Sequence, residues 1–126
     1  MPTVMLIEDD VTMLSLLKTL LEIEGYQVLQ YQQNTDLVAT LRRDLPDTII
    51  LDVHLQRQNG LDMLKVIRGD EFLKDTRVIM SSGKNLRLEC LEAGADDFLL
   101  KPFMPEDLLK SIKSTERQSK QWSGDS

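Results

Sequence analysis

The stretch Thr48-Ile49-Ile50-Leu51-Asp52 decides the fold class, because it is a continuous aliphatic run that ends abruptly in a carboxylate. A strand that is apolar at successive positions is buried on both faces, as happens inside a parallel sheet covered by helices. Four further short runs rich in aliphatic residues flank it, at residues 4–7, 27–31, 77–80 and 97–100. Segments with helical spacing separate them, so the pattern predicts alternating strands and helices.

Five segments carry an apolar stripe of helical period, and several have an end signal. The stripe within residues 13–21 precedes Gly25, a residue suited to a helix C-cap. We expect Asn34 or Thr35 to cap the second helix and Pro46 to end it. The other stripes consist of Leu61, Leu64 and Ile67, then Leu88 and Leu91, and finally Leu108, Leu109 and Ile112 after Pro105.

Five strand–helix units allow a closed barrel or an open sheet, and they are too few for the eight-stranded barrel. We therefore expect an α/β fold, an open doubly wound five-stranded parallel sheet with five helices on two faces. The length of 126 residues suits one domain. We assign residues 1–118 to this domain and residues 119–126 to a polar tail or linker, because no sustained apolar stripe follows residue 114.

The composition excludes several classes of protein. A net charge of -6 opposes the attraction to phosphate that drives nucleic-acid binding, so we expect no direct nucleic-acid contact by this domain. No apolar run approaches the ~18 residues that span a bilayer, and the N-terminus lacks the basic start of a signal peptide. We expect no membrane association and a cytoplasmic location. Cys90 is the only cysteine, so an internal disulfide is impossible.

Polar residues follow four of the predicted strands. Glu8 and Asp9 come after the first, Asp52 after the third, Ser82 after the fourth and Lys101 after the fifth. Two carboxylates about 5 Å apart repel by roughly 3 kcal/mol at an effective dielectric constant near 20, so gathering three of them calls for a cation. Mg²⁺ prefers carboxylate, water and phosphate oxygens. The pattern predicts a Mg²⁺ site in which Asp52 attacks phosphorus, while Ser82 and Lys101 contact the phosphoryl oxygens.

The sequence resembles the receiver domains of two-component response regulators. The stretches that carry the resemblance are Val4-Met5-Leu6-Ile7-Glu8-Asp9-Asp10, Ile49-Ile50-Leu51-Asp52-Val53-His54-Leu55 with Gly60-Leu61 following, Val78-Ile79-Met80-Ser81-Ser82-Gly83, and Gly94-Ala95-Asp96-Asp97-Phe98-Leu99-Leu100-Lys101-Pro102-Phe103. The resemblance implies the strand order 2-1-3-4-5. It also implies that Asp52 receives phosphate from a histidine kinase or phosphotransfer protein. Beside Glu8, the Mg²⁺ ligands it implies are Asp9, Asp52 and the backbone carbonyl of His54.

The resemblance further implies a switch rather than an enzyme acting on outside substrates. Ser82 and Phe98 match the hydroxyl and aromatic switch pair, and the bond between Lys101 and Pro102 matches a cis peptide. Modification is expected to rearrange the face formed by helix 4, strand 5 and helix 5 for a downstream effector domain or protein. His54 and Lys84, two residues after Asp52 and Ser82, are expected to modulate the lifetime of the phosphoryl group.

Some features depart from the family pattern. The segment from Ser82 to Phe98 is a few residues short, which predicts a trimmed fourth helix or leading loop and weakens the expectation of dimerisation through that face. Phe98 stands where tyrosine is commoner, and Gln56 where many relatives have proline. Met104, at the expected N-cap of the last helix, has no side-chain acceptor.

Other classes of protein fit less well. An aspartate-nucleophile phosphatase normally has a second acid where this chain has His54. A flavin module needs a hydroxyl- and glycine-rich phosphate loop, whereas the acidic run Glu8-Asp9-Asp10 repels phosphate. The alternative left open is a receiver-like protein interaction module that is not phosphorylated.

Overall fold

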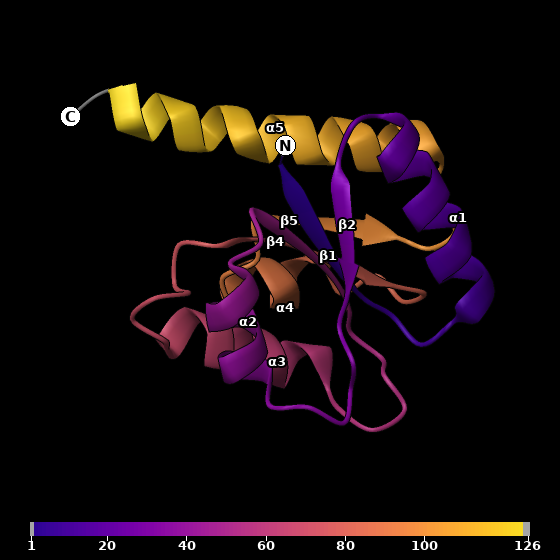
Figure 1. Ribbon diagram of the computed structural model, residues 1–126, viewed down its shortest axis with the longest axis horizontal. Coiled ribbons are helices and arrows are strands. Elements are labelled where there is room, and N and C mark those ends of the chain that lie inside the picture. The colour runs from indigo at the N-terminus through magenta and orange to yellow at the C-terminus, as the bar shows by residue number, and fades with distance from the viewer. Residues whose placement is uncertain (1, 125–126) are drawn as a thin grey trace.

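The five strands form one sheet in the order β2-β1-β3-β4-β5, and every neighbouring pair is parallel (Figure 1). The structure is a computed structural model that describes residues 2–124. Its strands are β1 (Thr3–Ile7), β2 (Gln27–Gln30), β3 (Thr48–Asp52), β4 (Arg77–Ser82) and β5 (Asp97–Leu100). Its helices are α1 (Val11–Ile23), α2 (Leu37–Asp44), α3 (Gly60–Gly69), α4 (Arg87–Glu92) and α5 (Pro105–Gly124). The predicted fold class and strand order are confirmed.

Helices cover both faces of the sheet, with α1 and α5 on one side and α2, α3 and α4 on the other (Figure 1). Alternating residues of β1 separate into two cores: Val4 and Leu6 pack toward α1 and α5, whereas Met5 and Ile7 pack toward the other three helices. Successive strand side chains point to opposite faces, so both sets must be apolar. This explains the continuous aliphatic runs.

The expected N-cap of the second helix was wrong. Asp36 caps α2, with its Oδ1 accepting the backbone N–H of Ala39 at 3.1 Å, in place of Asn34 or Thr35. Thr35 belongs instead to the preceding turn, where its hydroxyl donates to the carbonyl of Gln32. Asp10 caps α1 by accepting the N–H of Met13 at 3.0 Å, as a carboxylate at this position can.

The backbone of the last helix remains helical to Gly124. The division into a domain at residues 1–118 and a polar tail or linker at residues 119–126 stays a prediction, and residues 125–126 lie outside the described residues. The polar residues concerned include good helix formers such as glutamine and lysine, and no proline or glycine interrupts them before Gly124. Helical propensity therefore continues where the apolar stripe ends. No helix among residues 2–124 combines the length and apolarity needed to cross a bilayer.

The strand register brings the ends of the central strands to one edge of the sheet. Ile7 pairs with Leu51, so the residues that follow, Glu8 and Asp52, leave β1 and β3 at the same level. Asp52 pairs with Ser81, which places Ser82 one residue further on. The polar strand ends thus share a single rim.

Candidate functional site

The centre of the site is an ion-paired group made of Glu8, Asp52 and Lys101. Lys101 Nζ lies 2.5 Å from Glu8 Oε1 and 3.3 Å from Asp52 Oδ2. The side chains of the two acids are 7% and 10% exposed, and that of Lys101 is 21% exposed. The ends of β1, β3 and β5 supply these groups, so residues far apart in the chain meet as predicted from their strand-end positions.

The charges in this group are not balanced. Burial raises the pKa of the Asp52 carboxyl, the carboxylate of Glu8 raises it further, and Lys101 lowers it by less than these two effects combined. For Lys101, burial lowers the pKa, but its hydrogen bonds to Glu8 and Asp52 and the charges of both carboxylates together outweigh burial and leave the pKa above its ordinary value. One ammonium therefore faces two carboxylates, and the surplus negative charge destabilises ionised Asp52.

Asp9 does not join the group. Its carboxylate accepts the backbone N–H of Gln56 at 2.5 Å and contacts the side-chain amide of Gln33, within a small polar pocket beside the loop that follows β3. Among the described residues, no three histidine, cysteine, aspartate or glutamate side chains are gathered closely enough to hold a metal ion as they stand. Nothing in the sequence identified Gln33 as a neighbour of Asp9, because the contact depends on how the loop after β2 folds back.

The oxygen donors nevertheless fit a hard divalent cation. Glu8 and Asp52 offer carboxylate oxygens in one pocket with surplus negative charge, which is the chemistry Mg²⁺ prefers. The backbone of His54 lies beside them, since its N–H donates to Asp52 Oδ1 at 3.3 Å. Asp9 would have to move closer to this pair to contribute a third carboxylate.

The backbone around Asp52 is fixed by the start of α3. The N–H of Gly60 donates to the carbonyl of Val53 at 2.8 Å, and Asn59 caps the helix by accepting the N–H of Leu61 at 2.8 Å. A Cβ placed on Gly60 would lie 2.2 Å from the carbonyl oxygen of Asp52, which is inside any allowed contact. Only glycine lets α3 approach the end of β3 this closely.

Among the described residues, no hydrogen bond or ion pair joins the expected switch residues, Ser82 and Phe98, to the acidic group. Ser82 is fully buried, and its Oγ accepts the N–H of Lys84 at 3.0 Å. Phe98 is 2% exposed and belongs to the core on the α4 side of the sheet. The bond between Lys101 and Pro102 is cis, the form that the resemblance implies.

The doubly wound sheet, with carboxylates and a lysine at the carboxyl ends of its strands, defines a flavodoxin-like domain with an acidic site. The chain belongs to the response regulator receiver domain family, whose model matches residues 4–113. It is thus a receiver domain of the kind found in response regulators.

Individual relatives support this assignment. Transcriptional regulatory protein CpxR of Klebsiella pneumoniae is 38% identical over 126 residues, covering 98% of this chain and 52% of that protein. Phosphate regulon transcriptional regulatory protein PhoB of Pseudomonas aeruginosa is 28% identical, covering 93% and 52%. The chain therefore spans about half the length of the curated relatives it matches.

Solved structures give the same picture of the fold. A CheY-like response regulator receiver domain protein from Methanospirillum hungatei has a TM-score of 0.81 and 28% identity, covering 96% of this chain and 98% of that one. The chemotaxis response regulator CheY4 of Vibrio cholerae has a TM-score of 0.77 and 26% identity, covering 91% and 98%.

Proposed function

We propose that this domain accepts a phosphoryl group on Asp52 from a histidine kinase or phosphotransfer protein and changes its surface in response. The observation that carries the proposal is the buried carboxylate of Asp52, held at the end of a central strand within 3.3 Å of the Lys101 ammonium. An immobilised carboxylate beside a cation suits a nucleophile whose attack on phosphorus places negative charge nearby.

The transfer itself is simple in chemical terms. A carboxylate oxygen of Asp52 forms a bond to phosphorus, the bond from phosphorus to the donor nitrogen breaks, and that nitrogen keeps the electron pair and takes a proton. The product is an acyl phosphate. Lys101 would neutralise part of the charge on the phosphoryl oxygens. We propose no reaction on outside substrates, because the group that is modified belongs to the protein itself.

We propose that Mg²⁺ binds here through Glu8, Asp52, the backbone carbonyl of His54 and a reoriented Asp9. When bound, Mg²⁺ supplies positive charge that offsets the carboxylates and the incoming phosphoryl oxygens. The pKa of Asp52, raised first by burial and then by the carboxylate of Glu8, supports this part of the proposal, because a bound cation would offset both effects. A thermal melt provides a readout other than phosphorylation: Mg²⁺ should stabilise the wild type and have much less effect on Glu8→Gln.

The response is expected to involve Ser82, Phe98 and the face formed by α4, β5 and α5. In this structure the ring of Phe98 is already buried, so the conformation described is the one with the aromatic side chain inside. Phosphorylation would then act by shifting the population between conformations rather than by creating a new one. The partner that reads the face is proposed to be a downstream effector domain or protein, as the relatives' names as transcriptional regulators suggest.

Mass spectrometry after incubation with acetyl phosphate and Mg²⁺ tests the proposal. We expect the wild type to gain the mass of one phosphoryl group and Asp52→Asn to gain none. Asp10→Asn is a matched control, because Asp10 is exposed, lies near the site and can be replaced by asparagine as a helix cap. The engagement of Asp9 by Gln33 and Gln56 favours the alternative of an unphosphorylated interaction module, and an unmodified wild type would establish that alternative.

A further inference from the structure

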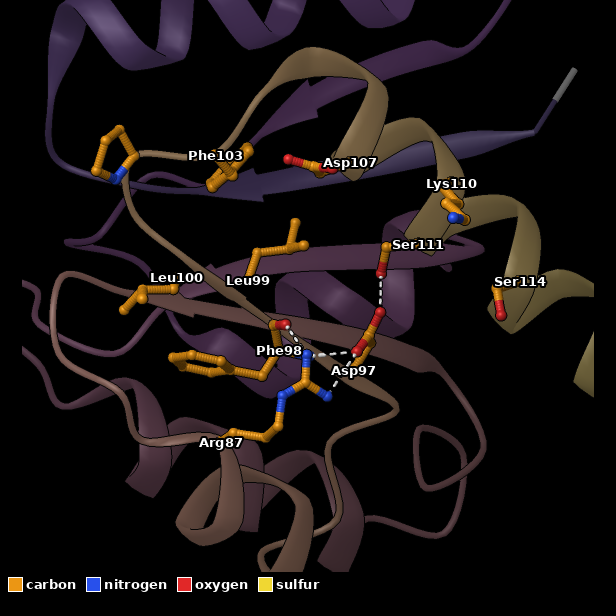
Figure 2. A pocket seen from close by; sticks show the side chains of 11 residues that line it. Arg87, Asp97, Phe98, Leu99, Leu100, Phe103, Asp107, Lys110, Ser111 and Ser114 are labelled. Atoms are coloured by element: carbon orange, nitrogen blue, oxygen red, sulfur yellow. Dashed lines mark hydrogen bonds and ion pairs between the residues drawn. The ribbon is translucent and has the colours of Figure 1, made fainter.

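The outer edge of β5 is occupied by side chains rather than by another strand. β5 is the last strand of the sheet and pairs only with β4. The backbone N–H of Phe98 donates to Asp97 Oδ1 at 2.8 Å. The carbonyl of Phe98 accepts from Arg87 Nη2 at 2.9 Å (Figure 2). Both backbone groups of the expected switch residue are therefore satisfied by side chains at a free edge, where exposed groups would otherwise invite pairing.

Arg87 makes this contact from a different layer of the molecule. It is the first residue of α4, on one face of the sheet, while Asp97 turns toward α5 on the other face and accepts from the hydroxyl of Ser111 at 2.5 Å (Figure 2). The guanidinium thus passes around the edge of β5 and forms part of an open groove of about 450 Å³ between α4, β5 and α5. Arg87 thus joins α4 to β5, and Asp97 joins β5 to α5.

The two contacts of Arg87 differ in strength. Its distance to Asp97 Oδ1 is 3.4 Å, and the side chain is 52% exposed, so this ion pair contributes little. The bond to the carbonyl of Phe98 is shorter and well formed at 2.9 Å. Arg87 consequently acts mainly on the backbone of Phe98, with Asp97 helping to orient the guanidinium.

The position of Arg87 also places it close in sequence to Ser82, at the end of β4. The hydroxyl of Ser82 accepts the N–H of Lys84, and only Asn85 and Leu86 separate Lys84 from Arg87. Leu86 occupies the N-cap of α4 without a side-chain hydrogen bond, and the N–H of Arg87 donates to Asn85 Oδ1 at the long distance of 3.3 Å, so the start of this six-residue helix is held weakly. A displacement of Ser82 would reach Arg87 through a short segment, and Arg87 would convey it to the carbonyl of Phe98.

We infer that Arg87 is a positioning residue that makes α4 and β5 respond together when Asp52 is modified. This inference rests on the proposed function, because it concerns regulation of the same site. Arg87 does not touch Glu8, Asp52 or Lys101 through any contact in the described structure, so its removal should leave phosphorylation possible. Removing the Arg87 side chain should therefore change how α4 and β5 respond to phosphorylation, without abolishing phosphorylation itself.

Amide hydrogen exchange followed by NMR tests the inference on the complete chain. We expect Arg87→Ala to speed exchange of α4 amides such as that of Cys90 about fivefold, the effect of losing one typical hydrogen bond. Alanine is the better helix former, so propensity cannot explain a faster rate. Arg87→Lys should recover only part of the protection from exchange, since lysine lacks the planar guanidinium group of arginine. Arg43→Ala, which removes another exposed arginine paired with an aspartate, should leave these rates unchanged.

The decisive comparison adds acetyl phosphate and Mg²⁺, with the mass of each sample measured in parallel. In the wild type, exchange at Cys90 and Phe98 should change by the same factor on phosphorylation, whereas in Arg87→Ala the two factors should differ. The inference is overturned if wild type and Arg87→Ala are both phosphorylated and show equal factors, or if Arg87→Ala leaves exchange in α4 unchanged. A wild type that gains no phosphoryl mass overturns the proposed function, and this inference with it.

Discussion

Replacing Asp52 with asparagine should stabilise the metal-free protein while removing the proposed phosphoacceptor. Asparagine has nearly the same shape as aspartate but carries no charge. The side chain of Asp52 is 10% exposed and shares Lys101 with Glu8, so its ionised form bears both a cost of burial and repulsion from a second carboxylate. A functional residue that lowers stability is a common consequence of an electrostatically strained site.

The distances between the charged groups determine the expected change in the free energy of unfolding. Lys101 Nζ is 3.3 Å from Asp52 and 2.5 Å from Glu8, so the two carboxylate oxygens concerned are separated by at most the sum, 5.8 Å. At an effective dielectric constant near 20 their repulsion is at least about 3 kcal/mol, and the attraction of Asp52 to Lys101 is about 5 kcal/mol. Burial of the carboxylate costs several kcal/mol more, which leaves a net gain for asparagine of about 1 to 2 kcal/mol.

Urea denaturation and thermal melting in EDTA at pH 7 measure the gain, which corresponds to a rise in Tm of about 4 to 8 °C for a domain of this size. The pKa of Asp52 is higher in the folded chain than its ordinary value of 3.8. Such a group adds stability below its unfolded pKa and loses that contribution as the pH rises through the folded pKa. The advantage of Asp52→Asn should therefore be largest near neutral pH and shrink toward pH 4.

Asp10→Asn controls for the change in net charge, and it should alter stability by less than about 0.5 kcal/mol because asparagine and aspartate cap helices equally well. Mg²⁺ should make the wild type more stable than Asp52→Asn, because it stabilises the wild type selectively. An Asp52→Asn variant that is less stable than the wild type at pH 7 without metal would refute the electrostatic reasoning.

Three further changes test other parts of the site. Lys101→Met should cost about 3 kcal/mol in metal-free urea denaturation, because it leaves two buried carboxylates without their cation, and a loss below about 1 kcal/mol would contradict this. Gly60→Ala should cost more than about 2 kcal/mol, owing to the 2.2 Å approach of the new Cβ to the carbonyl of Asp52, and unchanged stability would show that α3 shifts freely. His54→Ala should change the decay rate of the phosphorylated protein, followed by mass, but leave Asp52 modifiable; complete loss of modification in a folded variant would count against a modulating role.

The sequence was sufficient for the fold because several independent signals agreed. Fully apolar strands can be satisfied only by helices on both faces, and five units cannot close the barrel. The meeting of Glu8, Asp52 and Lys101 followed from the rule that parallel strands end at one edge of the sheet. Local boundaries were less predictable: Thr35 and Asp36 are both good caps, and the hydroxyl of Thr35 is taken up by the carbonyl of Gln32 in the preceding turn, which leaves Asp36 to cap the helix.

Side-chain direction at the site could not be predicted from spacing alone. Asp9 follows Glu8 directly, yet its carboxylate faces Gln56 and Gln33 because the loops after β2 and β3 present donors there. The contact that Arg87 makes could not be predicted from the sequence either. Its partner is a backbone carbonyl, and any residue at position 98 would provide one. A contact to a backbone atom does not depend on which side chain the partner residue carries, so the sequence cannot reveal it.

The central claim is that the carboxylate of Asp52, and no other group, carries the phosphoryl. Sodium borohydride reduces an acyl phosphate of aspartate to homoserine, so treatment after incubation with acetyl phosphate and Mg²⁺ marks the modified residue permanently. Peptide mass spectrometry should find homoserine at position 52. Homoserine at Asp9 or Asp10 instead, or an unchanged aspartate at position 52 in protein that has gained the phosphoryl mass, would contradict the account.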